Sequence, residues 1–151
     1  MKKMKYKNLE EELEDVNKNG LFIKHIRNPS EAVQLAACKE DSWSIDYIKN
    51  PSEAVKLEAV RKNGLSIQFI KNPSKDVQLE AVEEDGYSIE HIKNPSKVIQ
   101  LEACKQNGYS IEYIKNPSLE VQLEACKYNS DCIQYIKNPE ALFKKYPSLC
   151  I

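Results

Sequence analysis

The sequence predicts an all-α fold, an α-solenoid built from 22-residue helix-turn-short-helix repeats within a single domain. The dipeptide Asn-Pro recurs every 22 residues and contains six of the seven prolines of the 151-residue chain. All four glycines also share one phase, since each lies eight residues before the Asn-Pro of the next repeat. Proline and glycine mark helix ends and turns, so their common register indicates a repeated helical unit.

We divide residues 1–151 into a degenerate N-terminal cap repeat, five full repeats and a C-terminal cap helix. The cap repeat covers residues 1–27, and the cap helix covers residues 138–151. The full repeats cover residues 28–49, 50–71, 72–93, 94–115 and 116–137. The first copy lacks Asn-Pro and is mostly acidic over residues 10–15. An end repeat meets water on its outer face, which accounts for that acidic composition.

Each repeat is expected to begin with a long α-helix. With the Asn counted as position 1, this Asn is the predicted N-cap and the Pro is the first helical residue. Apolar residues at positions 6, 8, 10 and 11 span more than half of a helical wheel. So wide an arc predicts burial on both sides, with Leu101 at position 8 in the core. Asn or Asp at position 14 and Gly at position 15 are expected to end the helix in a left-handed conformation.

A shorter element is expected after this turn. Ser at position 17 would begin it, and the isoleucines at positions 18 and 21 would share one face of a helix. With barely two turns, this helix is short enough to be a 3₁₀ helix. A β-strand, as in leucine-rich repeats, is the alternative, although a strand would send the two isoleucines to opposite faces.

The sequence carries no catalytic arrangement, phosphate loop or metal-ligand spacing, so we expect a protein without enzyme activity, cofactor or metal. Three cysteines share one repeat position with two valines, which is typical of a small apolar core site. These residues are Cys38, Cys104, Cys126, Val60 and Val82. Cys132 and Cys150 are expected to be exposed. The odd number of cysteines favours a reduced, cytoplasmic setting. The sequence also lacks an apolar run that would serve as a membrane span or a secretion signal.

The candidate binding surface is an aromatic stripe at positions 16 and 20, on the short elements. Aromatic side chains are enriched among the residues that dominate binding energy at protein interfaces. Carboxylates flank the stripe at position 19. The candidate residues are Trp43, Asp46, Tyr47, Phe69, Tyr87, Glu90, His91, Tyr109, Glu112, Tyr113 and Tyr135. The alternative is that these rings stack between repeats and only stabilise the array.

Two rows of polar residues suggest further roles. Lysines at position 22 form a candidate nucleic-acid interface, because cations spaced along a solenoid can follow a phosphate backbone. The row is Lys49, Lys71, Lys93, Lys115 and Lys137. An acidic row at position 9 and a formal net charge of −1 at pH 7 weigh against that role. Glutamines at position 7 are expected either to bond a nearby backbone turn or to line a groove. They are Gln34, Gln78, Gln100 and Gln122.

The segments NPSEAVQLAACK at residues 28–39 and NPSLEVQLEACK at residues 116–127 resemble a tandem-repeat family. That family has NPSxxVQLxA repeats, occurs in bacteria, phages and large DNA viruses, and has no known function. The chain is also similar to the HEAT-like and leucine-rich-repeat-variant α-solenoids. The resemblance spans residues 9–143 and implies the fold but no catalytic residues. We therefore expect a scaffold that binds another protein, in a narrower form a phage-encoded inhibitor of a host or defence protein. A self-associating structural repeat is the alternative, and the oligomeric state stays open.

Overall fold

A computed structural model of the chain describes residues 8–127, 130–136 and 138–147. In these ranges every regular element is helical, and α-helices alternate with 3₁₀ helices, written η. The elements are α1 Leu9–Lys18, η1 Gly20–His25, α2 Glu31–Glu40, η2 Ser42–Tyr47, α3 Glu53–Lys62, η3 Gly64–Phe69, α4 Lys75–Glu84, η4 Gly86–His91, α5 Lys97–Gln106, η5 Gly108–Tyr113, α6 Leu119–Cys126, η6 Ser130–Tyr135 and α7 Glu140–Lys145. The predicted all-α solenoid is confirmed, and the short elements are 3₁₀ helices rather than β-strands.

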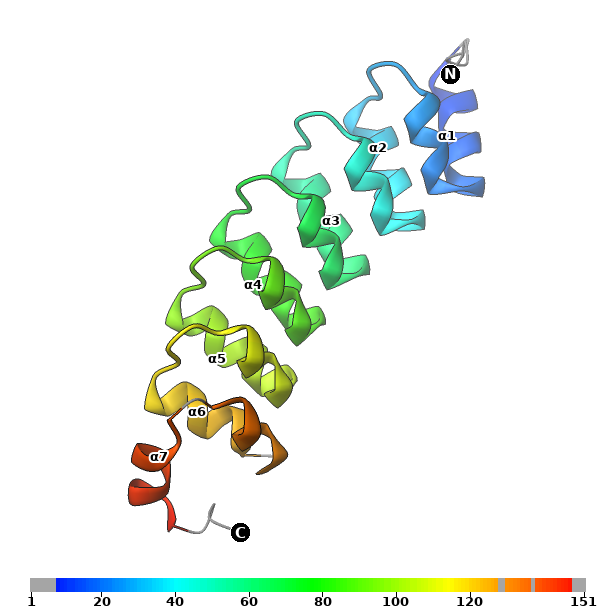
Figure 1. Cartoon of the computed structure of the whole chain (residues 1–151). Helices are drawn as coiled ribbons and strands as arrows, with labels where there is room; N and C mark the ends of the chain where they lie inside the picture. Colours follow the sequence, from blue (N-terminus) through cyan, green and yellow to red (C-terminus); the bar gives the residue numbers. More distant parts are fainter. Residues whose placement is uncertain (1–7, 128–129, 137, 148–151) are drawn as a thin grey trace.

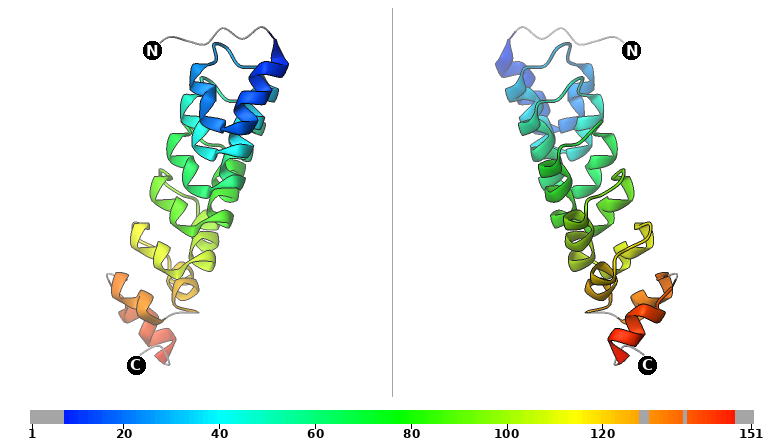
Figure 2. Two further views of the ribbon diagram at one scale, coloured as in Figure 1. Left: turned by 90° about the vertical axis from the view of Figure 1, so that its right-hand side faces the viewer. Right: turned by 90° about the vertical axis from the view of Figure 1, so that its left-hand side faces the viewer.

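The helices form two columns that run along the length of the molecule. Each α-helix packs against the α-helix of the next repeat, and each 3₁₀ helix packs against the next 3₁₀ helix. Figure 1 shows this stacking from the N-terminal end to the C-terminal end. The turned views in Figure 2 place α1 and α7 at opposite ends of an elongated molecule. Among the described residues, the structure has no helix with the length and apolar character needed to cross a bilayer.

The α-helices of the full repeats, α2 to α6, begin later than predicted, because serine rather than asparagine is their N-cap. Ser30 accepts the backbone N–H of Val33 on its Oγ at 3.4 Å. Ser52, Ser74, Ser96 and Ser118 cap the following helices in the same way. The asparagine at position 1 adopts a positive φ in every full repeat, 58° at Asn28 and 51° to 53° in the others. Asparagine tolerates this left-handed conformation better than most residues. It therefore reverses the chain, and the predicted role as N-cap is wrong.

The ends of α2 to α5 also differ from the prediction. Asp41 at position 14 is extended, with a φ of −141°, and its N–H donates to the Ala37 carbonyl at 2.8 Å. Its Oδ1 accepts the N–H of Trp43 at 2.9 Å, so one residue ends α2 and begins η2. None of the glycines has a positive φ, and the left-handed helix end is wrong. Glycine is needed instead for close approach, because a Cβ on Gly64 would lie 2.3 Å from the Ala81 carbonyl oxygen.

One hydrophobic core runs through all repeats, at positions 6, 10, 11, 18 and 21. Val77, Ala81 and Ile89 in the third repeat are at most 1% exposed. The leucines at position 8 are only partly buried, so the expectation that Leu101 lies in the core is wrong. Position 8 stands at the outer edge of the apolar arc, roughly 60° beyond position 11 at 100° per residue. The leucines therefore border the core without being enclosed by it.

Candidate functional site

The aromatic side chains of the candidate stripe pair between repeats. A ring at position 16 contacts the ring at position 20 of the next repeat. The ring centroids lie 5.1 Å apart for Trp43 and Phe69, 6.1 Å for Tyr87 and Tyr113, and 5.9 Å for Tyr109 and Tyr135. All three pairs have edge-to-face geometry, which suits the ring quadrupoles. The rings thus join successive 3₁₀ helices.

Most of these rings are exposed in spite of their pairing. Trp43 is 44% exposed, Tyr47 49%, Tyr87 37%, Tyr113 38% and Tyr135 36%. Phe69 and Tyr109 are partly buried and pack against the core. The two interpretations of the stripe, an exposed surface or an inter-repeat stack, are therefore compatible. A ring can contribute an edge to the neighbouring repeat while its face stays in solvent.

The second half of the stripe lines one open groove, with a volume of about 470 Å³. Its walls come from η3, η4, η5 and η6, and its lining residues are Leu65, Tyr87, Glu90, His91, Tyr109, Glu112, Tyr113 and Tyr135. The candidates Trp43, Asp46, Tyr47 and Phe69 do not line it. Leu65 was not among the candidates although it holds position 16, because an aliphatic residue does not stand out in an aromatic pattern.

The groove is acidic. Its charged lining residues are Glu90 and Glu112, and neither lysine nor arginine lines it. Neither carboxylate forms an ion pair within the described part of the chain. Desolvation raises the pKa of Tyr113, and the negative charges of Glu90 and Glu112 raise it further. The groove therefore combines aromatic faces with uncompensated negative charge.

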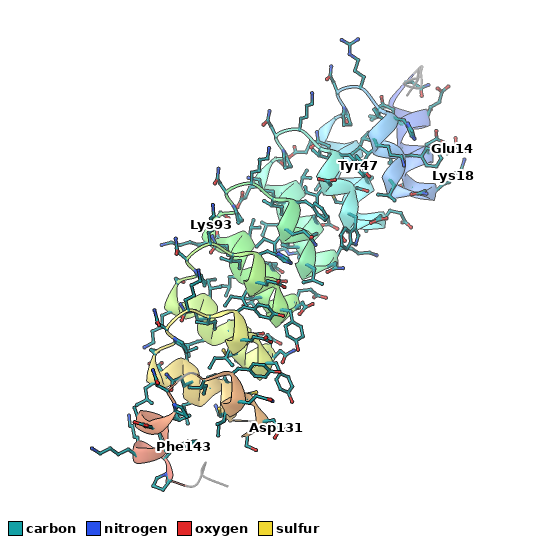
Figure 3. The ribbon with its side chains drawn as sticks, viewed as in Figure 1. Glu14, Lys18, Tyr47, Lys93, Asp131 and Phe143 are labelled. Carbon is teal, nitrogen blue, oxygen red and sulfur yellow. The ribbon has the colours of Figure 1, made fainter. Side chains whose placement is uncertain are left out.

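The lysine row lies on a different edge, where the chain turns from a 3₁₀ helix into the next α-helix. Lys49, Lys71, Lys93 and Lys115 are exposed and form no ion pair with any described residue. Figure 3 shows Lys93 on this edge of the ribbon, whereas Lys137 lies outside the described residues.

The acidic row at position 9 lies on the α-helices, where three of its glutamates pair with lysine or arginine. Glu80 pairs with Arg61 at 3.0 Å, Glu102 with Lys105 at 3.1 Å and Glu124 with Lys127 at 3.5 Å. The two rows therefore do not neutralise each other.

The glutamines at position 7 brace the start of their own α-helices. The Nε2 of Gln100 donates to the Pro95 carbonyl at 2.9 Å, and Gln34, Gln78 and Gln122 repeat this bond. The expected bond to the backbone is present, within one repeat rather than across two. Gln100 and Gln122 also line cavities of about 460 and 700 Å³ beside the lysine row. Both expected roles of the glutamines therefore have a structural counterpart.

The four cysteines in the described part of the chain are buried, and burial favours their protonated form. Burial raises the pKa of Cys38 and of Cys104 to about 12, and that of Cys126 to about 11. Cys132 is 0% exposed, so its predicted exposure is wrong. It holds position 17, which faces inward, and the fully buried Ser44, Ser66, Ser88 and Ser110 hold the same position. Cys150 lies outside the described residues. Protonated, buried thiols are inert as nucleophiles.

The described part of the chain contains no group of three or more His, Cys, Asp or Glu residues that could hold a metal ion. Comparison with known proteins adds no site: no family model matches the chain, and no curated protein or solved structure matches it significantly. The resemblance to the 22-residue repeat family therefore stays a prediction.

Proposed function

We propose that the chain is a non-catalytic interaction module that binds another protein through the aromatic groove of η3 to η6. The observation that carries this proposal is the convergence of exposed tyrosines from three successive 3₁₀ helices, η4, η5 and η6, on one hollow surface. Tyrosine is enriched among the residues that dominate binding energy, and such residues cluster in the centre of an interface.

The side chains of the groove are also preorganised for binding. Its tyrosines are held by edge-to-face contacts between repeats, and the isoleucines of the same 3₁₀ helices anchor the backbone in the core. A partner would therefore order few side chains on this surface, and the entropic cost of association would be small.

The proposal places the interaction in the cytoplasm of the producing or infected cell. Four free, buried cysteines suit a reducing compartment. A narrower form of the proposal is an inhibitor that covers the surface of its target. This form needs no chemistry beyond shape and charge complementarity.

A pull-down from nuclease-treated lysate tests the proposal, with Tyr87→Ala/Tyr113→Ala as the binding variant. Trp43→Ala is the matched control, because Trp43 is an equally exposed member of a ring pair but does not line the groove. We expect one protein in stoichiometric amount with the wild type and with Trp43→Ala. Loss of two central tyrosines should weaken its binding by about 2 kcal/mol or more, roughly thirtyfold in Kd. Unchanged recovery with the double variant would refute the groove as the interface.

Nucleic acid is the second candidate partner, because the lysines at position 22 are exposed and without acidic partners in the described residues. Binding along this row would weaken steeply as salt is raised, with a slope set by the number of phosphates contacted. Lys71→Gln/Lys93→Gln/Lys115→Gln should lower that slope. Absence of RNA or DNA binding at low salt would remove this candidate.

A further inference from the structure

At its N-terminal end the aromatic stripe already holds a cation. The Nζ of Lys24 lies over the Tyr47 ring, 6.0 Å from the ring centroid. Lys24 is at position 19 of the cap repeat, and Tyr47 is at position 20 of the next repeat. An ammonium group over a ring face is attracted by the negative potential of the π-system. The fold therefore places position 19 beside the tyrosine of the following repeat.

The same two positions carry a carboxylate and a tyrosine further along the stripe. Glu90 precedes Tyr113, and Glu112 precedes Tyr135, at the phases that Lys24 and Tyr47 hold. All four residues line the aromatic groove. A carboxylate near a ring face adds negative charge where the ring is already electron-rich. The raised pKa of Tyr113 reflects this surplus in part. At position 19, the third and fourth full repeats therefore carry a carboxylate, whereas the cap repeat carries Lys24.

We propose that the groove receives an arginine or lysine side chain of a partner protein, seated against Tyr113 between Glu90 and Glu112. This inference rests on the proposed protein-binding function and specifies the chemistry of the partner. The cation would complement two carboxylates that lack ion-pair partners among the described residues, and it would contact tyrosine faces as Lys24 contacts Tyr47.

Other occupants fit the groove less well. An acidic segment would meet two like charges. A neutral apolar segment would cover Glu90 and Glu112 without compensating them, and an uncompensated carboxylate is costly to desolvate. Arginine is the better cation of the two, because its planar guanidinium can stack on a tyrosine and bond a carboxylate at the same time.

The first experiment titrates the full chain with N-acetylarginine amide and, separately, with N-acetylcitrulline amide, its neutral isostere. Signals of ¹³C-labelled tyrosine rings report binding. We expect saturable shifts at Tyr87, Tyr113 and Tyr135, smaller shifts at Tyr47, where Lys24 is already in place, and at least about tenfold weaker binding of the citrulline compound. Equal binding of both compounds, or shifts by neither, would overturn the proposal.

Charge-neutral variants test the carboxylates with little change of shape. Glu90→Gln/Glu112→Gln should lower the affinity for N-acetylarginine amide about tenfold. Glu83→Gln/Glu84→Gln removes two charges from the exposed last turn of α4, outside the groove, and should leave the affinity unchanged. Equal affinities of the two double variants would mean that net charge alone attracts the cation, and the site would be rejected.

The protein partner recovered by pull-down separates this inference from the proposed function. A partner lost by Tyr87→Ala/Tyr113→Ala and by Glu90→Gln/Glu112→Gln supports both. A partner lost by the tyrosine variant but kept by the glutamine variant leaves the interaction module in place and overturns the cation. A partner that both variants retain overturns the aromatic groove itself.

Discussion

Gly64→Ala tests one of the close contacts between repeats. Gly64 begins η3, and a Cβ there would lie 2.3 Å from the Ala81 carbonyl oxygen and 2.6 Å from the Ser88 Oγ of the next repeat. Ordinary contact starts near 3.4 Å, so the two repeats must separate by about 1 Å to admit one methyl group. The atom in the way is backbone and cannot turn aside as a flexible side chain would.

The expected loss follows from two opposing effects. Overpacking a close-packed interior costs about 1–3 kcal/mol. Alanine also restricts the unfolded chain, which returns about 0.4–1 kcal/mol where φ is not positive, as at Gly64. We therefore expect Gly64→Ala to lower the free energy of unfolding by roughly 1–2 kcal/mol. Neighbouring repeats support only each other, so hydrogen exchange should quicken most in η3 and η4.

Urea unfolding followed by circular dichroism measures the change. Ser42→Ala is the matched control, because Ser42 holds the phase of Gly64 one repeat earlier and a Cβ is already accommodated there. Ser42→Ala should therefore alter the free energy of unfolding by less than about 0.5 kcal/mol. If Gly64→Ala were equally harmless, the close approach would not be the reason for glycine at this position.

Three further predictions concern a helix cap, an asparagine with positive φ and the buried thiols. Ser96→Ala should cost about 1 kcal/mol as a lost N-cap, and Asn94→Ala should cost about 1–2 kcal/mol more than Asn94→Gly because φ is positive there. Urea unfolding checks both, and full stability of Ser96→Ala would contradict the assigned cap. Burial raises the pKa of Cys38 and of Cys104 from 9.0 to about 12, so the unfolded chain loses these protons at lower pH than the folded chain. The free energy of unfolding should therefore fall as pH rises from about 9 towards 12. Cys38→Val/Cys104→Val should flatten that dependence, and equal slopes would speak against a contribution from these thiols.

Much of the architecture can be predicted from the spacing of a few residue types. The positions of Val77, Ala81 and Ile89 are apolar in every full repeat, and these three residues are buried, as their phases indicate. Periodicity identifies such residues because a helix repeats its inward face at regular intervals. The aromatic residues at positions 16 and 20 can also be identified from the sequence. Seven of the eleven candidate binding residues, two of them carboxylates at position 19, line one groove.

The residues at which the helices begin and end are harder to predict from the sequence. Asparagine before proline suits both an N-cap and a left-handed turn, and glycine suits both a helix end and a close contact. At Gly64 the choice depends on how the next repeat approaches, because that repeat supplies the nearby backbone. The predicted exposure of Cys132 is wrong for a similar reason. Position 17 lies inside the 3₁₀ helix and faces the preceding repeat near Gly108.

The sequence by itself therefore determined the repeat length, the alternation of a long with a short element and most of the residues that form the core. These follow from periodicity along one chain direction. The tertiary structure decided which rings meet, that Glu90 and Glu112 share a groove with Tyr113, and that Lys24 lies over Tyr47. Such contacts join different repeats, so they depend on the offset between neighbouring units. That offset results from packing in three dimensions and leaves no periodic mark in the sequence.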